Sequence, residues 1–496
     1  KEWIIATKLE RQYTKQEIIA LYLNKVDFVN SAVGIRSASK IYMGKEPKDL
    51  TIEESALFVG MLKNPALFNP TKEKRKEKVF NRRNTVLDQM VKNKYLSEGK
   101  AAQLKKLPVK INFKPESHAE GTATYFREYL RESLKPIIKA IEEEKGEEID
   151  LYTAGLKIYT TVDSRMQQYA EEAVEEHLSN LQPEFNRRQK DNPTAPFLDI
   201  TPEETQKIMN QAMKNSERWR IMSINGKSDA EIKQSFEVPA KMKIFTWKGE
   251  RDTIMKPKDS ILYYKHFLQT GMMAMEPQTG HVKAWVGGIN YKYFQYDHVG
   301  QGARQVGSTF KPFVYATAID RLGKSPCDMI MDSPFTILKG DNNDKDWTPN
   351  NSDGKFRGLV SMKKALANSI NTVSARLIHE VGAPAVVEMT KNLGVTSDIP
   401  NRPAIALGAV EITVEEMVAA FSTFANEGVY IKPQLITRIE DKNGVVIYQG
   451  VEESHDVVNK DVAYSIIKLM EGVTESGTGS RLRWAASAPS NFLTGV

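Results

Sequence analysis

Apolar side chains recur at the spacing of an α-helix in the N-terminal part of the chain. Two such groups are Ile4, Ile5 and Leu9, then Ile18, Ile19 and Leu23. The segments Thr14-Lys-Gln-Glu17 and Thr51-Ile-Glu-Glu54 have the form of capping boxes, and an apolar run follows each of them. The run 72–83 is crowded with Lys, Arg and Glu, which indicates a solvated helix face. The pattern predicts a mainly helical part over residues 1–105.

The pattern is mixed between residues 106 and 260. Residues 157–162 are rich in strand-forming side chains, and Asp163 can cap the helix that follows. Residues 180–260 are polar, and Thr201-Pro-Glu-Glu204 combines a helix cap, a proline at the first helical position and an acidic first turn. We interpret 106–260 as an α+β linker or accessory region with an insertion, in which no chemistry can be identified.

A third pattern begins at residue 261. Residues 272–275 and 281–286 have strand character and are separated by a turn at 276–280, so they predict a β-hairpin. An apolar helix is expected from Phe310 to Ile319. Pro312 is tolerated only in the first turn of that helix, which places Ser308 at or near its N-terminus. This part, residues 261–496, is expected to be an α+β domain with an antiparallel sheet and helices.

Composition limits the possible functions. A chain of 496 residues accommodates about three domains. The net charge of +6 is a mild basic bias that suits an anionic membrane surface or substrate and does not indicate nucleic acid. The seven histidines show no metal-ligand spacing. The single cysteine, Cys327, excludes an internal disulfide and is expected to be a small buried side chain.

Ser308-Thr-Phe-Lys311 carries the clearest candidate chemistry. A serine and a lysine three positions apart lie on one face of a helical turn, where the lysine amine can take the serine proton. Burial can lower the pKa of such a lysine toward neutrality. The helix dipole would favour negative charge near the serine. The alternative is a serine helix cap beside an ordinary surface lysine.

A second element, Ser369-Ile-Asn371, follows 61 residues after Ser308, between two apolar helical runs. Its order and spacing after S-x-x-K point to a shared site, although a helix cap is again the plain alternative.

Residues 261–496 resemble the transpeptidase domain of class A penicillin-binding proteins. The matching segments are 275–280, 286–288, 304–313, 347–350, 365–371, 406–408, 424–428 and 477–479. The resemblance implies that Ser308 is the nucleophile, Lys311 its base, and Ser369 and Asn371 relay and positioning groups. It also implies that Trp347 and Asn350 lie in a substrate-binding loop near the cleft, although a structural turn with a packed indole is an equal alternative.

Residues 1–105 resemble the C-terminal part of the lysozyme-like peptidoglycan glycosyltransferase of the same proteins. The matching segments are 9–18, 21–24, 34–35, 42–45, 53–57, 64–70 and 82–87. Glu2 matches the glutamate of the family's R-K-x-x-E motif, and the resemblance implies a role for it in catalysis or in binding substrate or metal. The alternative for Glu2 is an exposed residue at a frayed end.

The resemblance implies a peptidoglycan synthase that polymerises lipid II and crosslinks D-Ala-D-Ala stem peptides through a serine acyl-enzyme, and that β-lactams inhibit. No cofactor is expected in the transpeptidase, and a divalent metal is possible in the glycosyltransferase. The expected location is the extracytoplasmic face of the bacterial cytoplasmic membrane, through an N-terminal anchor outside this chain.

The family's K-T-G strand does not occur in the sequence, and both ends resemble cut ends. We therefore expect a fragment that is impaired in both activities. Two other classes remain open: a β-lactam sensor that is acylated without turnover, and a monofunctional D,D-carboxypeptidase or β-lactamase. The glycosyltransferase segments disfavour both.

Overall fold

The computed structural model describes residues 2–30, 32–113, 121–152, 154–340 and 345–485; the side chains of residues 2, 4, 5, 8, 484 and 485 lie outside this description. The chain forms two compact units. The first consists of residues 1–120 and 146–156, and the second of residues 121–145 and 157–496.

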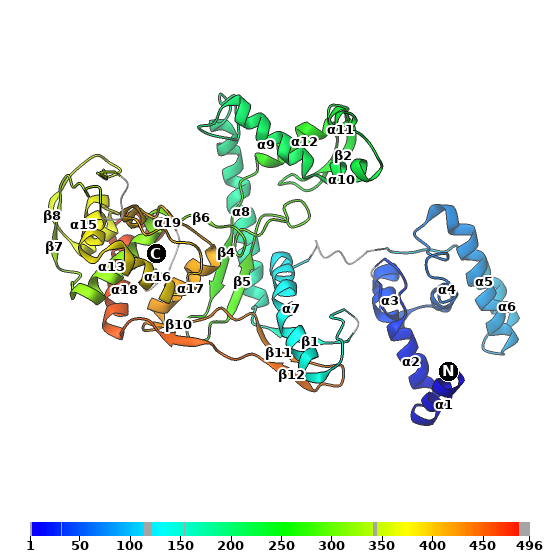
Figure 1. The fold of residues 1–496 in the computed structure, drawn as a ribbon. Helices are drawn as coiled ribbons and strands as arrows, with labels where there is room; N and C mark the ends of the chain where they lie inside the picture. Colours follow the sequence, from blue (N-terminus) through cyan, green and yellow to red (C-terminus); the bar gives the residue numbers. More distant parts are fainter. Residues whose placement is uncertain (1, 31, 114–120, 153, 341–344, 486–496) are drawn as a thin grey trace. The chain divides into compact units, whose positions relative to one another are not determined.

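The first unit is helical, as the apolar spacing predicts (Figure 1). Its helices are α1 (Glu2–Gln12), α2 (Lys15–Lys25), α3 (Ile35–Met43), α4 (Ile52–Met61), α5 (Lys76–Lys92) and α6 (Glu98–Lys106), with short 3₁₀ turns η1 (Pro47–Asp49) and η2 (Glu73–Arg75). Both predicted capping boxes are present, at Thr14 and Thr51. The core is built around the buried rings of Phe28, Tyr42 and Phe58.

The charged run 72–83 is solvated except at Arg83. Most of its charged side chains are exposed, but Arg83 on α5 is only 1% exposed. Its guanidinium donates to the Asn84 side chain and the Lys105 carbonyl, while Nη1 is buried with no partner among the described residues. Burial lowers the pKa of Arg83. The interpretation of the whole run as a solvated face is therefore wrong at this residue, because the helix turns Arg83 toward the protein interior.

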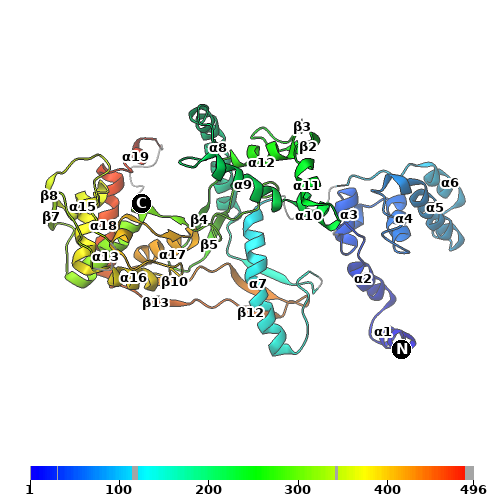
Figure 2. The same ribbon diagram turned by 45° about the horizontal axis from the view of Figure 1, so that its top comes forward.

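The second unit begins with two long helices, α7 (Thr124–Lys145) and α8 (Ser164–Arg188). One end of α8 leads into a small helical group, drawn in green in Figures 1 and 2. This group comprises α9 (Pro202–Lys214), α10 (Glu217–Ile224), α11 (Asp229–Ser235) and α12 (Pro257–Lys265), with the hairpin β2 (Ala240–Ile244) and β3 (Arg251–Met255). Asp163 caps α8 and Thr201 forms a capping box on α9, as predicted.

The named strands of the second unit pair antiparallel. The predicted hairpin is formed by β4 (Met272–Met275) and β5 (Val282–Val286). A three-stranded sheet has the order β1 (Lys157–Thr160), β11 (Ile436–Glu440), β12 (Val446–Gln449), so a strand from early in the unit joins two from near its end. The remaining pairs are β6 (Arg304–Gln305) with β9 (Glu411–Ile412), β7 (Met329–Asp332) with β8 (Gly358–Ser361), and β10 (Val429–Ile431) with β13 (Ser454–Asp456).

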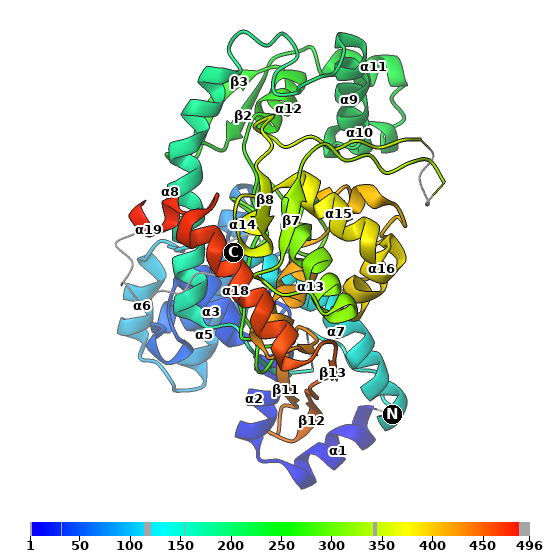
Figure 3. The same cartoon turned by 90° about the vertical axis from the view of Figure 1, so that its left-hand side faces the viewer.

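The main core of this unit surrounds α13 (Lys311–Leu322), which is buried along most of its length. The helices packed with it are α14 (Met362–Ala367), α15 (Asn371–Val381), α16 (Ala383–Asn392), α17 (Val414–Ala425) and α18 (Lys460–Ser476); the 3₁₀ turns η3 (Gly307–Phe310) and η4 (Pro403–Leu407) and helix α19 (Arg481–Ala485) complete the unit. Figure 3 shows α18 lying beside α14. Each fully buried Phe or Val of α13 contributes about 1.5–3 kcal/mol to folding.

Cys327 is exposed rather than buried, because it lies in the turn between α13 and β7 and not within an element. Over the described part of the chain, no helix has both the length and the apolar character needed to cross a bilayer.

Candidate active site

Ser308 lies in η3, the 3₁₀ turn that leads directly into α13. Its side chain is exposed, whereas Phe310 two residues later is buried and anchors the turn in the core. Two main-chain hydrogen bonds fix the start of this turn. The Val306 N–H donates to the Val410 carbonyl, and the Gly307 N–H donates to the Gly408 carbonyl at 3.2 Å. The prediction that Ser308 stands at the start of an apolar helix is confirmed.

Lys311 is the first residue of α13, and its side chain is completely buried. Its Nζ donates to the Ser369 carbonyl oxygen at 2.7 Å, to Ser369 Oγ at 2.9 Å and to Asn371 Oδ1 at 2.7 Å. An ammonium has three N–H donors, so these three acceptors satisfy all of them. Burial lowers the pKa of Lys311 to about 8, because a charged amine loses its hydration inside the protein.

Ser369 connects the lysine to the exposed serine. Its Oγ lies 2.9 Å from Lys311 Nζ and 2.9 Å from Ser308 Oγ. Among the described side chains no hydrogen bond joins Ser308 directly to Lys311. Ser369 sits in the short connection between α14 and α15 with φ +53°, a left-handed conformation that is uncommon outside glycine. That backbone turn presents both the carbonyl and the hydroxyl of Ser369 to the lysine.

The arrangement can move a proton in either direction. With Lys311 charged, its N–H groups point at their acceptors and the Ser369 hydroxyl donates to Ser308. When Lys311 loses one proton, its lone pair can accept from Ser369, and Ser369 in turn can accept from Ser308. The serine–serine–lysine chain is therefore a route by which Ser308 can be deprotonated.

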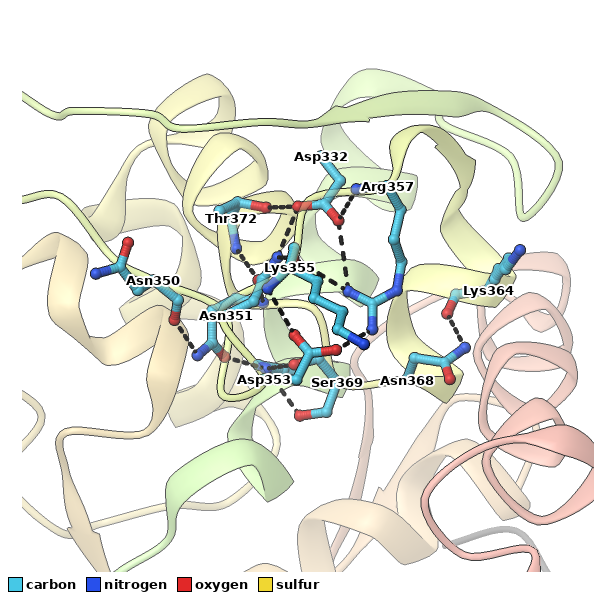
Figure 4. Close-up of polar contacts among 12 residues, drawn as sticks. Asp332, Asn350, Asn351, Asp353, Lys355, Arg357, Lys364, Asn368, Ser369 and Thr372 are labelled. Carbon is cyan, nitrogen blue, oxygen red and sulfur yellow. Dashed lines mark hydrogen bonds and ion pairs between the residues drawn. The ribbon is translucent and has the colours of Figure 1, made fainter.

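Asn371 is the first residue of α15 and closes the site on the other side of the lysine. Its Oδ1 accepts from Lys311, and its Nδ2 donates to the main-chain carbonyl of Asn350 at 2.8 Å. Figure 4 shows the side chain of Asn350 directed away from this contact. The S-x-x-K and S-x-N segments are thus brought together, as their spacing suggested.

The loop that carries Trp347 lies beside this site. Trp347 is half-buried and packs against the main core, and its main chain forms two hydrogen bonds of 2.9 Å with Ile337. Asn350 is exposed and contacts Asn371 only through its carbonyl oxygen. The role of both residues in substrate binding stays a prediction.

Sequence reasoning missed the neighbouring residue, Asn351. It is 6% exposed, and its Oδ1 accepts from the main-chain N–H groups of Asn371 and Thr372. The sequence from Trp347 reads Trp-Thr-Pro-Asn-Asn, so a Trp-x-Pro-x-Asn pattern counted from Trp347 ends on Asn351 and not on Asn350.

Glu2 belongs to the first unit. It is the first residue of α1, but its side chain lies outside the described residues. In the part of the chain that the structure describes, no three His, Cys, Asp or Glu side chains converge as a metal-binding group. The possible divalent metal of the first unit therefore has no described ligand set.

Comparison with protein-family models finds three matches along the chain. Residues 1–91 match the family described as transglycosylase, residues 192–268 the penicillin-binding protein middle domain, and residues 270–489 the penicillin binding protein transpeptidase domain. The second match covers most of the polar stretch in which the sequence suggested no chemistry. The expected multidomain fold class is confirmed by these matches together with the helical and antiparallel elements.

Known proteins give the same assignment. The chain is 29% identical to penicillin-binding protein 1A of Rickettsia bellii over 96% of its own length and 64% of the relative's. It is also 29% identical to penicillin-binding protein 1A of Aquifex aeolicus, over 97% of this chain and 64% of that protein. The chain thus spans less than two thirds of the length of these relatives.

A solved structure agrees with the fold. The crystal structure of penicillin-binding protein 1A from Haemophilus influenzae has a TM-score of 0.62 with 24% identity, covering 96% of this chain and 76% of that one. Transglycosylase and transpeptidase matches lie in one polypeptide, and penicillin-binding protein 1A relatives align along nearly all of it. The chain belongs to the class A penicillin-binding proteins.

Proposed function

We propose that the full protein is a peptidoglycan synthase that polymerises lipid II into glycan strands and crosslinks D-Ala-D-Ala stem peptides, and that β-lactams acylate it. The observation that carries the crosslinking half is the continuous contact from Ser308 Oγ through Ser369 Oγ to the buried Lys311 Nζ. The transglycosylase match over residues 1–91 supports the polymerising half.

Acylation begins when Ser308 Oγ attacks the carbonyl carbon between the two D-alanines. The Ser308 proton passes to Ser369, and the Ser369 proton passes to neutral Lys311. The new C–O ester bond forms, the C–N amide bond breaks, and the proton held by the relay is returned to the amine of the departing D-alanine. This exchange leaves an acyl-enzyme and a neutral relay.

The second half-reaction reverses the proton flow. An amine of a neighbouring stem peptide attacks the ester carbon, the C–N bond of the crosslink forms, and the C–O bond to Ser308 breaks. The relay takes the proton of the attacking amine and returns one to Ser308. The N-terminus of α13 and the Ser308 main-chain N–H support the negative charge that develops on the carbonyl oxygen in both halves.

For the first unit we propose a glycosyltransferase in which Glu2 assists catalysis or binds the diphosphate of the substrate. A divalent metal, where one is used, would neutralise diphosphate charge. We further propose that the protein works at the extracytoplasmic face of the cytoplasmic membrane, held by an anchor outside residues 1–496. The transglycosylase match disfavours the sensor and the monofunctional hydrolase, since neither requires a glycan polymerase.

Fluorescent penicillin tests the nucleophile on the full-length protein. The wild type is expected to form a covalent adduct that survives denaturing electrophoresis, and Ser308→Ala is expected to abolish it, because no other exposed hydroxyl among the described residues is linked through a second serine to a buried lysine. Ser260→Ala, on the remote helix α12, is the matched control and is expected to label like the wild type. A labelled Ser308→Ala protein would disprove the assignment.

A further inference from the structure

A buried carboxyl group lies behind the candidate active site at the end of β7. Asp332 is 1% exposed, and Figure 4 shows it at the centre of a polar network. Its Oδ1 accepts from Thr372 Oγ1 at 2.6 Å and from Asn351 Nδ2 at 2.7 Å. Its Oδ2 accepts from the Arg357 main-chain N–H at 2.9 Å and lies 3.7 Å from the Arg357 guanidinium.

These contacts join three segments that are distant in sequence. Asp332 ends a strand, Asn351 and Arg357 belong to the loop that follows Trp347, and Thr372 lies in the first turn of α15. A buried carboxyl group is costly unless its oxygens are hydrogen-bonded, so the network favours one relative placement of the three segments. The mechanism proposed above uses none of these four residues.

The hydrogen-bond network of Asp332 ends at the main-chain N–H groups of Asn371 and Thr372, at the start of α15. Helix α15 has Ile370 at its N-cap position, and no side chain of its own caps its first N–H groups. Asn351 supplies the missing acceptor from another segment, since its Oδ1 accepts from the N–H of Asn371 at 2.9 Å and of Thr372 at 3.3 Å. The contact of Asp332 with Asn351 Nδ2 fixes which way that amide faces, and therefore which atom meets the helix.

We infer that Asp332 and Asn351 are positioning residues for the acylation reaction, holding the start of α15 so that Asn371 and Ser369 meet Lys311. The inference rests on the proposed function. It explains two features that the S-x-N segment alone does not. One is how a helix with isoleucine at its N-cap position is capped. The other is the orientation of Asn371, whose Nδ2 donates to the carbonyl of Asn350 in the same loop as Asn351.

Displacement of Asn371 would also change how Lys311 titrates. Asn371 Oδ1 accepts a hydrogen bond from Lys311 Nζ, and such an acceptor stabilises the ammonium form. The hydrogen bonds of Lys311 in the described structure all go to uncharged oxygens, of Ser369 and Asn371; the charged groups of the network are Asp332, Asp353 and Arg357. Loss of the Asn371 contact lowers the pKa of Lys311.

The test measures the second-order rate of acylation by fluorescent penicillin against pH in the full-length protein. Asp332→Asn places an amide N–H against the Arg357 N–H and is expected to slow acylation about 10- to 100-fold, as a displacement of about 1 Å can do. The pH at which the acylation rate reaches half of its maximum is expected to fall by about one unit. Thr372→Val removes one donor to Asp332 without changing side-chain shape. It is expected to lower the acylation rate and the midpoint of its pH dependence as Asp332→Asn does, but by smaller amounts.

Asp328→Asn is the control, since it makes the same charge change on an exposed residue just before β7 whose carboxylate contacts only the Ser325 N–H among the described residues. It is expected to keep the wild-type rate and midpoint. Thr372→Ser, which keeps the hydroxyl, is expected to restore both.

The outcomes separate clearly. A slower rate with an unmoved midpoint in Asp332→Asn and Thr372→Val would indicate only a loss of folded protein and would overturn the inference, as would unchanged rates in both. If Asp332→Asn does not fold, Thr372→Val decides alone. Absence of labelling in the wild type would instead refute the proposed function.

Discussion

At the residue scale, the central feature is a lysine whose three donors are all engaged. Because the pKa of Lys311 is about 8, the amine is mostly an ammonium at neutral pH, with roughly a tenth of molecules neutral at pH 7. When Lys311 is charged, the Ser369 hydroxyl donates its hydrogen bond to Ser308 Oγ. The Ser308 hydroxyl is then the acceptor and keeps its own proton. Only the neutral minority has the lone pair that starts the proton transfer.

The pH dependence of acylation follows from this. An amine whose pKa is lowered in the folded state is mostly neutral above that pKa, so the rate of β-lactam acylation is expected to rise between pH 6 and 9 with a midpoint near 8. Stopped-flow measurement with the full-length protein checks this. A midpoint near 10, the ordinary lysine range, would show that burial does not tune this amine.

The residues found from sequence are those whose signal is local. Ser308 and Lys311 lie three positions apart and Ser369 and Asn371 two apart, so short patterns identify them. Asp332 was missed because its partners lie 19, 25 and 40 positions away, distances over which no helical or strand period operates. Arg83 was misjudged because composition alone does not say which face of a helix each charge occupies.

At the element scale, the turn that carries Ser308 depends on a two-residue ribbon and a pair of glycines. Strand β6 ends at Gln305 and pairs with β9, and Gly307 meets Gly408 immediately before Ser308. A Cβ on Gly408 would lie 1.8 Å from the Gly307 carbonyl oxygen, and Gly408 has φ +72°. No other residue type fits there without moving the serine.

Substitution at this contact is therefore expected to affect chemistry as well as stability. Gly408→Ala should slow penicillin acylation at least about tenfold, because the backbone beside Ser308 must shift. Gly323→Ala is the matched control: Gly323 also has a left-handed φ, +64°, at the other end of α13, but no atom lies within 4 Å of its added Cβ. It should cost about 1 kcal/mol of folding stability and leave the acylation rate unchanged.

Equal acylation rates in the two glycine variants would contradict this account of the turn. Urea unfolding of both variants separates the stability effect, which they share, from the effect on Ser308, which only Gly408→Ala should show.

Elements with their own start signals were predictable. Capping residues marked α2, α4, α8 and α9, and a turn between two apolar runs marked the β4–β5 hairpin. The pairing of β1 with β11 and of β6 with β9 was not, since each joins segments separated by about a hundred residues or more and the short strands carry no signal of their partner.

At the scale of the whole molecule, residues 121–145 and 157–260 are integral to the second unit. Tyr129 of α7 stacks on Trp285 of β5 with ring centroids 4.3 Å apart. Gln167 of α8 is fully buried and hydrogen-bonds both the N–H and the carbonyl of Trp285. The sequence-based division at 260 and 261 therefore separates elements that pack in one core.

The consequence can be measured with two expressed fragments. Residues 121–496 are expected to unfold cooperatively, whereas residues 261–496 are expected to be less stable by at least about 3 kcal/mol, because aromatic contacts of α7 and the buried Gln167 are lost. The exposed edge of β11 should also promote association. Urea unfolding measures the stability of the two fragments, and light scattering measures their association. Equal stability would contradict the conclusion that residues 121–145 and 157–260 belong to the core of the second unit.

The pairing of Lys157 with Glu440 has a further consequence for how the protein is made. Lys157 of strand β1 is synthesised 283 residues before its partner Glu440, a delay of roughly 14–57 s at about 5–20 residues per second. During that time the first unit can fold, but β1 has no partner. A cell that makes this chain must therefore keep an unpaired strand from meeting other chains until the last part of the second unit is synthesised.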